Sequence, residues 1–224
     1  VAAGNMDELK SGISFSLRLM LFLTIPAMAA LMALNLPIIS VLFQRGAFDV
    51  PSAVYTGQAL FCYALGLWAF SVLRVFVSSF YSLQDSKWPM KAAVIALIVN
   101  VVASLILMYP LKHNGIALAS SIAAAVNVLV LTIVLKRKIG KFLDRAFYYS
   151  VFKIILSSVL MLFAIGVIEY VIPWNTHAGF KARLLYLSVA VTAGAATFFI
   201  SAYLLKSPEM QAFANIVKKR LSRP

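Results

Sequence analysis

Six long apolar segments dominate this sequence and leave few folds open to it. They cover residues 13–36, 54–80, 90–108, 115–135, 149–171 and 184–205. A helix needs about 20 apolar residues to cross the hydrocarbon core of a bilayer, and each segment has about that length. None alternates between apolar and polar residues as the strands of a membrane β-barrel do. The segments therefore predict an all-α integral membrane protein built as a six-transmembrane-helix bundle.

The overall composition supports this prediction and excludes several other classes. Apolar residues make up 62% of the chain and charged residues 12%, whereas soluble domains are nearer half apolar and about a quarter charged. Neither a soluble domain nor a disordered chain fits these values. A single cysteine, Cys62, and two histidines, His113 and His177, exclude a disulfide framework and multi-cysteine metal centres. We therefore expect no metal site.

The formal net charge of +13 has an explanation in the membrane topology. With six spans, both termini lie on one side, and fifteen of the 20 Lys and Arg residues fall on that side, including a basic run at residues 136–141. Four fall on the other side: Arg45, Lys112, Lys181 and Arg183. The positive-inside rule then places both termini in the cytoplasm. The topology therefore explains the excess of positive charge without nucleic-acid binding, and we expect no nucleic-acid partner.

The two ends of the chain support two further expectations. Residues 1–11 are polar, with neither a start methionine nor a signal peptide, and we interpret them as a loop in the C-terminal part of a longer protein. In residues 208–224, apolar residues recur at helical spacing ahead of a basic cluster. This pattern is typical of an amphipathic helix on the cytoplasmic leaflet. A basic tail that only fixes the topology is the alternative.

Polar residues inside the spans are the candidates for function, because they are costly in a bilayer. Arg74 lies at the cytoplasmic end of the second span; it either lines an aqueous cavity and binds an anionic head group, or snorkels to the interface. Asn100 and Ser104 share one face of the third span, and Ser120 and Asn127 share one face of the fourth. These faces either form a small cation site or make interhelical hydrogen bonds.

The sequence lacks the catalytic residues that intramembrane enzymes need. The sequence has no Gly-x-Ser-Gly turn with a membrane histidine, no Walker-type glycine loop and no paired acidic clusters for magnesium. Its only adjacent acids, Asp7 and Glu8, precede the first span. We expect a protein that is not an enzyme.

An ordered series of motifs resembles the MurJ (MviN) family of lipid II flippases. The series consists of Pro26, LFQRGAF at 42–48, YALGL at 63–67, FYSLQD at 80–85, Pro89, Asn100, GIALASS at 115–121 and Asn127. The likeness covers about residues 12–140. Beyond that it rests on hydropathy, the basic loop and the spacing of two further spans.

The resemblance implies a place for each part of the chain in a fourteen-helix transporter of the multidrug/oligosaccharidyl-lipid/polysaccharide exporter superfamily. Residues 1–140 would supply four helices that complete the second lobe. Residues 141–207 would supply two extra helices that form an apolar groove for a lipid tail, and residues 208–224 a basic cytoplasmic tail. The N-terminal lobe, which is missing from this chain, would hold most of the cationic cavity.

The function that the resemblance implies is the flipping of lipid II, the undecaprenyl-linked peptidoglycan precursor. It would move from the cytoplasmic to the periplasmic leaflet of the bacterial inner membrane by alternating access, in the service of cell-wall synthesis and cell shape. The expected partners are this precursor, membrane lipids and the N-terminal lobe. No cofactor is expected apart from a coupling cation, sodium or a proton. Some family members bind sodium at positions matching Asn100 and Ser120, but Ser104 stands where those members have an acidic residue.

Several alternatives stay open at this stage. The cargo could be another polyprenyl-linked sugar or a drug, or the chain could be a non-transporting lipid-binding scaffold. Pro26 and Gly66 are either places where helices adjust during transport or features of packing. Pro26 should in any case kink the first span, because it removes a backbone donor.

Overall fold

The computed structural model describes residues 6–175 and 178–210, and over these residues the chain forms eight α-helices and no strand. Their bounds are α1 Met6–Ala33, α2 Asn35–Phe43, α3 Val50–Ala64, α4 Leu67–Ser82, α5 Lys87–Leu111, α6 His113–Ile139, α7 Arg145–Val171 and α8 Phe180–Leu204. Six stretches of helix are long and apolar enough to cross a membrane, with α3 and α4 together counting as one. The predicted six-span, all-α architecture is confirmed.

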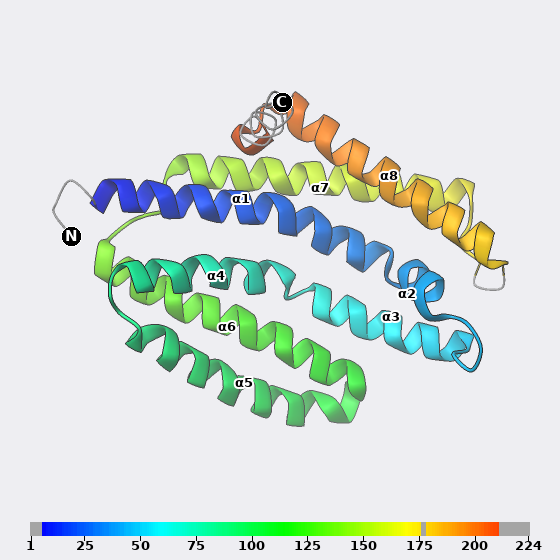
Figure 1. Ribbon diagram of the computed structural model, residues 1–224, viewed down its shortest axis with the longest axis horizontal. Coiled ribbons are helices and arrows are strands. Elements are labelled where there is room, and N and C mark those ends of the chain that lie inside the picture. Colours follow the sequence, from blue (N-terminus) through cyan, green and yellow to red (C-terminus); the bar gives the residue numbers. More distant parts are fainter. Residues whose placement is uncertain (1–5, 176–177, 211–224) are drawn as a thin grey trace, which may run out of the picture.

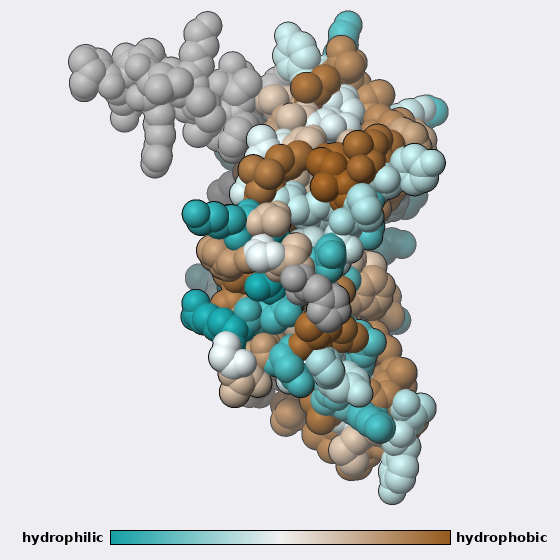
Figure 2. Space-filling model, turned by 90° about the vertical axis from the view of Figure 1, so that its right-hand side faces the viewer, coloured by the Kyte–Doolittle hydropathy of each residue, from teal (hydrophilic) through white to brown (hydrophobic). Residues whose placement is uncertain are grey.

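The helices lie in layers around α1 (Figure 1). On one side α1 packs against α3 and α4, which in turn pack against α6; on the other side it packs against α7 and α8. α5 is outermost and packs mainly against α6. The α4–α5 and α6–α7 connections share one end of the bundle with the start of α1, and the α2–α3, α5–α6 and α7–α8 connections share the other. Figure 2 looks onto this second end, where hydrophilic residues gather across the middle of the face.

The first predicted span differs from the structure at both ends. Helix α1 already begins at Met6, so the loop predicted for residues 1–11 is wrong from that residue on. Asp7 and Glu8 occupy the first helical turn, where negative side chains interact favourably with the helix dipole. At the other end the helix is interrupted at Leu34 and resumes as α2 with Pro37 in its first turn, a position that needs no backbone N–H. Pro26 itself lies inside continuous helix.

The second span is interrupted in its middle, at Leu65 and Gly66, where α3 ends and α4 begins. A Cβ atom at Gly66 would lie 2.7 Å from Oγ and 2.8 Å from Cα of Ser121 in α6, so only glycine permits this close approach. The Ser121 hydroxyl donates to the carbonyl of Cys62 at 2.7 Å. This hydrogen bond gives a partner to a backbone carbonyl next to the interruption. In apolar surroundings no water is present to do so.

The third and fourth spans are joined more tightly than predicted. The predicted spans end at residue 108 and begin again at residue 115, whereas in the structure only Lys112 separates α5 from α6, which already begins at His113. A Cβ at Gly115 would lie 2.2 Å from the carbonyl oxygen of Leu107, which explains how the two helices come so close. The His113 ring packs edge-on against Tyr55, whereas His177 lies outside the described residues.

Much of the apolar surface faces outward. Large side chains such as Ile106, Phe163 and Leu185 are 64 to 72% exposed, more contiguous apolar surface than a soluble monomer tolerates. Inside the bundle, small residues lie where helices approach closely. An example is Gly194 of α8, where an added Cβ would lie 3.1 Å from Ile165 of α7. Such small residues let membrane helices pack closely.

Candidate functional site

A cavity of about 540 Å³, named here the polar cavity, lies between the first half of α1 and the second half of α4, and its lining combines polar side chains with apolar ones such as Ile13 and Val75. Its polar lining consists of Glu8, Ser16, Arg74, Ser78, Ser79 and Ser82. Two of the serines are committed to their own helix, since Ser79 donates to the carbonyl of Val75 at 2.7 Å and Ser82 to that of Ser79 at 2.8 Å. Arg74 is the one cation in the described lining, and a guanidinium suits the oxygen atoms of a phosphate.

An apolar groove of about 170 Å³ follows farther along α1, where α7 and α8 pack against it. Its lining includes Phe22, Pro26, Leu34, Ile165, Val191 and Ala195, with almost no polar surface. Pro26, predicted as a conformational position, thus lines a surface suited to a hydrocarbon chain. The two hollows occupy successive halves of α1, the cavity from Glu8 to Met20 and the groove from Phe22 to Ala30.

The residues predicted as a cation site lie on α5 and α6 as expected, but they bond within their own helices. Ser104 donates to Oδ1 of Asn100 at 3.1 Å, and Ser120 donates to the carbonyl of Ile116 at 3.2 Å. Oδ1 of Asn127 is buried and has no hydrogen-bond partner within the described part of the chain. A site for sodium or a proton among these residues stays a prediction.

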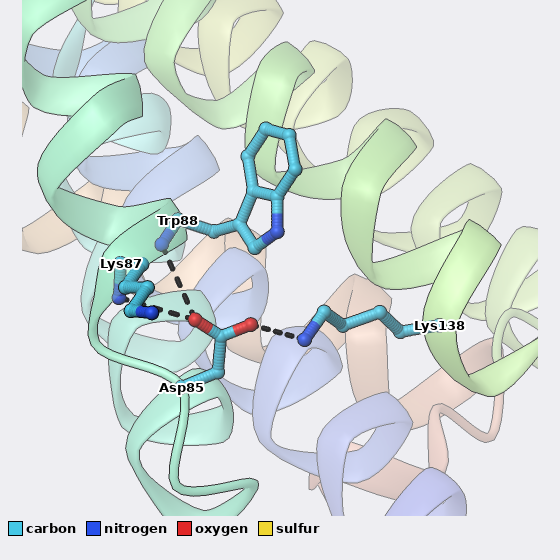
Figure 3. A network of polar contacts seen from close by, with 4 residues as sticks. All are labelled: Asp85, Lys87, Trp88 and Lys138. Atoms are coloured by element: carbon cyan, nitrogen blue, oxygen red, sulfur yellow. Dashed lines mark hydrogen bonds and ion pairs between the residues drawn. The ribbon is translucent and has the colours of Figure 1, made fainter.

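Asp85 fixes the α4–α5 connection to the end of α6 (Figure 3). Its carboxylate accepts backbone N–H groups from Lys87 at 3.1 Å and Trp88 at 3.4 Å, and also accepts from the Lys138 ammonium group. The hydrogen bond from Lys138 lowers the pKa of Asp85 below its ordinary value. The contact holds this end of the cavity helix α4 against α6.

The sequence reasoning missed an ion pair between the buried Glu209 and the partly buried Arg18, which it counted only among the cations of the cytoplasmic side. Oε1 of Glu209 lies 3.6 Å from Nε of Arg18, and Ser207 donates to Oε2 at 2.7 Å. Glu209 is 1% exposed. The Ser207-Pro208-Glu209 sequence is typical of a helix start, but no local pattern signals its burial. Of the amphipathic tail predicted for residues 208–224, residues 208–210 are helical, and residues 211–224 lie outside the described part of the chain.

Six helices that are long and apolar enough to span a bilayer, packed around α1, are the architecture of a multi-pass α-helical membrane protein. A family model described as "Lipid II flippase MurJ" matches residues 1–190. The chain belongs to this family.

Individual relatives and a solved structure agree with this assignment. The chain is 32% identical over 223 residues to a probable lipid II flippase MurJ of Rhizobium meliloti (strain 1021), covering 98% of the chain and 41% of that protein. It is 31% identical over 192 residues to the corresponding protein of Rickettsia prowazekii (strain Madrid E), covering 85% of the chain and 38% of that protein. A solved structure described as "Lipid II flippase MurJ, inward closed conformation" superimposes with a TM-score of 0.70 at 25% identity, over 90% of the chain and 41% of that structure. The chain thus spans about two fifths of the length of these relatives.

Proposed function

We propose that this chain forms the C-terminal part of a lipid II flippase of the bacterial inner membrane. Its relatives are named as lipid II flippases, and the chain matches only 41% of the length of the Rhizobium protein. The remaining part, an N-terminal lobe, would complete the transport path and supply most of its cationic lining.

The observation that carries the proposal is the succession of polar cavity and apolar groove along α1. Lipid II joins a charged diphosphate-sugar head to a long isoprenoid tail. A transporter has to keep the head in a wet polar space while the tail stays in an apolar environment. The Arg74 cavity would accept phosphate oxygens, and the groove between α1, α7 and α8 would accept part of the tail.

Alternating access requires helices that can change direction, and the chain has two interruptions that suit this role. One lies at Leu34 between α1 and α2, and the other at Gly66 between α3 and α4. Both flank the central helix α1, so rocking of this bundle against an N-terminal lobe would bend the chain there. Pro26 and Gly66 are therefore proposed as conformational positions. Asn100, Ser104 and Ser120 are proposed as the place where a coupling cation acts.

The proposed topology places the basic run at residues 136–141 and the C-terminus in the cytoplasm. The two connections on that side, α4–α5 and α6–α7, share one end of the bundle. That end carries Lys87, Lys136, Arg137, Lys138 and Lys141, all of them exposed. The positive-inside rule supports this orientation.

The test is growth of a bacterial strain depleted of its own flippase and supplied with the full-length protein that contains this chain. We expect restored growth and restored exposure of lipid II on the periplasmic leaflet. Arg74→Gln should impair both, whereas Lys87→Gln, at the same end of the bundle but outside the cavity, should impair neither. A full-length protein that inserts normally but restores neither growth nor lipid II exposure contradicts the proposal.

A further inference from the structure

A further, smaller hollow lies at the end of the bundle away from the basic loops, where α7 ends and α8 begins. Its volume is about 90 Å³, and its lining includes Ile172, Trp174, Asn175, Ala182, Arg183 and Tyr186. The Trp174 and Tyr186 rings pack together with centroids 5.1 Å apart. Tryptophan and tyrosine are typical of the head-group level of a bilayer, which is where the end of α7 and the start of α8 would lie.

Two buried N–H donors of this hollow have no acceptor within residues 6–175 and 178–210. Arg183 is only 9% exposed, and its Nη1 donates to the carbonyl of Ser40 in α2 at 3.3 Å. Its Nε is buried and has no hydrogen-bond partner among the residues that the structure describes, and the same holds for Nε1 of Trp174. Buried donors are normally satisfied, and an orphaned pair at one cavity calls for an acceptor.

The charges around the hollow favour an anion. Arg183 lies in the first turn of α8, at the positive end of the helix dipole, and Lys181 lies nearby on the surface. No acidic residue belongs to the described lining. Glu169, near the end of α7, is exposed and lies outside the lining, although its charge acts on Tyr186 of the lining.

We propose that this hollow binds a phosphate oxyanion, supplied by the head group of a membrane lipid. A volume of about 90 Å³ has room for one phosphate group but not for a sugar chain. On α8, the groove residue Gly194 follows Arg183 by eleven positions, about three turns and a rise of about 16.5 Å, so the two residues lie on one face of the helix. A lipid whose phosphate contacts Arg183 and Trp174 can therefore lay a hydrocarbon chain in the apolar groove. This site does not depend on flippase activity.

The experiment measures retained lipid by native mass spectrometry of the full-length protein in detergent. The probes are phosphatidylglycerol and diacylglycerol, which has matching chains but no phosphate. The variants are Arg183→Gln, which removes the charge, and Trp174→Phe, which removes only the N–H and keeps a ring against Tyr186. Lys181→Gln is the matched control, an exposed cation two residues from Arg183. Inorganic phosphate is added as a competitor in a separate arm.

We expect the wild-type protein to retain phosphatidylglycerol and not diacylglycerol. Each of the two site variants should weaken retention by about tenfold, as loss of a hydrogen bond to a charged group does, and the control should not. Because Trp174→Phe leaves the arginine contacts intact, it tests the site even if Arg183→Gln misfolds. Displacement of the lipid by millimolar phosphate would assign the site to free phosphate and overturn the lipid source. Equal retention of both lipids, or equal losses in Lys181→Gln and Trp174→Phe, would overturn the site itself.

Discussion

Glu209, just beyond the end of α8, and Arg18 in α1 form an ion pair with Oε1 and Nε 3.6 Å apart. The glutamate side chain is 1% exposed and the arginine side chain 18%. Because α8 is paired with α7, this contact ties the last two spans to the central helix near the polar cavity.

Glu209→Gln should destabilise the protein by about 3 kcal/mol, because it leaves a largely buried arginine without its counter-charge. Replacing both partners with methionine should restore most of the loss, since an apolar pair needs no counter-charge. Denaturant unfolding in detergent micelles measures both effects. Asp7→Asn, which removes the exposed partner of Lys10, should change stability by less than about 0.5 kcal/mol. A double variant less stable than either single variant would contradict this account.

Gly66→Ala should destabilise the protein by about 1–3 kcal/mol, the usual range for overpacking. The new methyl group would lie 2.8 Å from Cα of Ser121, a backbone atom that cannot rotate away. Gly166→Ala is the matched control, since a Cβ there meets nothing within 4 Å. We expect it to be neutral or slightly stabilising. Thermal unfolding in detergent distinguishes the two, and equal melting temperatures would show that the close approach does not constrain Gly66.

Loss of the Asp85 contact should show a characteristic pH dependence. The hydrogen bond from Lys138 holds the pKa of Asp85 below its ordinary value of 3.8. The stability that this contact provides is therefore complete above that value and is lost as the pH falls through the lower pKa of the folded state. The difference between wild type and Asp85→Asn should be constant from about pH 5 to about pH 8 and shrink below about pH 4. A difference that changes between pH 5 and 8 would identify another titrating group as the cause.

The sequence predicted those parts of the fold that depend on local composition. A run of about 20 apolar residues predicts a spanning helix regardless of its packing partners. The six runs in the sequence correspond to six helical stretches long and apolar enough to span a membrane. The interruption at Gly66 is set by contact with Ser121, whose hydroxyl bonds Cys62 across 59 residues of sequence. Hydropathy averaged along one segment cannot register such a contact.

In the candidate site, too, some residues could be predicted from local sequence and others only from contacts between distant segments. Arg74 was predictable because a cation inside an apolar run is costly and therefore marks a cavity or an interface. Glu209 and Arg183 lie close to predicted span ends, where charged residues are ordinarily exposed. Their burial comes from α1 and α2, elements far away in sequence. Their partners could be found only once the helices were placed.

Cysteine labelling should reveal the two ends of the bundle as opposite sides of the membrane. In a Cys62→Ser background, Lys181→Cys should react with a membrane-impermeant maleimide in intact spheroplasts, and Lys141→Cys only after lysis. Both side chains are exposed, so the difference reports the side of the membrane and not burial. Replacing Cys62 is safe for α3, since Ser121 bonds its backbone carbonyl. Labelling of Lys141→Cys in intact spheroplasts would invert the proposed topology.

Ala195→Trp should block the apolar groove without disturbing the bundle. Ala195 lines the groove and is exposed on α8, so an indole there fills a space of about 170 Å³. Excluding two or three methylene groups of a lipid tail costs roughly 2 kcal/mol, more than tenfold in affinity. Ala196→Trp is the matched control, because Ala196 follows Ala195 in sequence and is also exposed but lies outside the groove lining.

Binding of a polyprenyl phosphate to the full-length protein, together with its melting temperature, distinguishes the two variants. Equal affinities would show that the tail does not enter this groove, whatever the effect of either variant on growth.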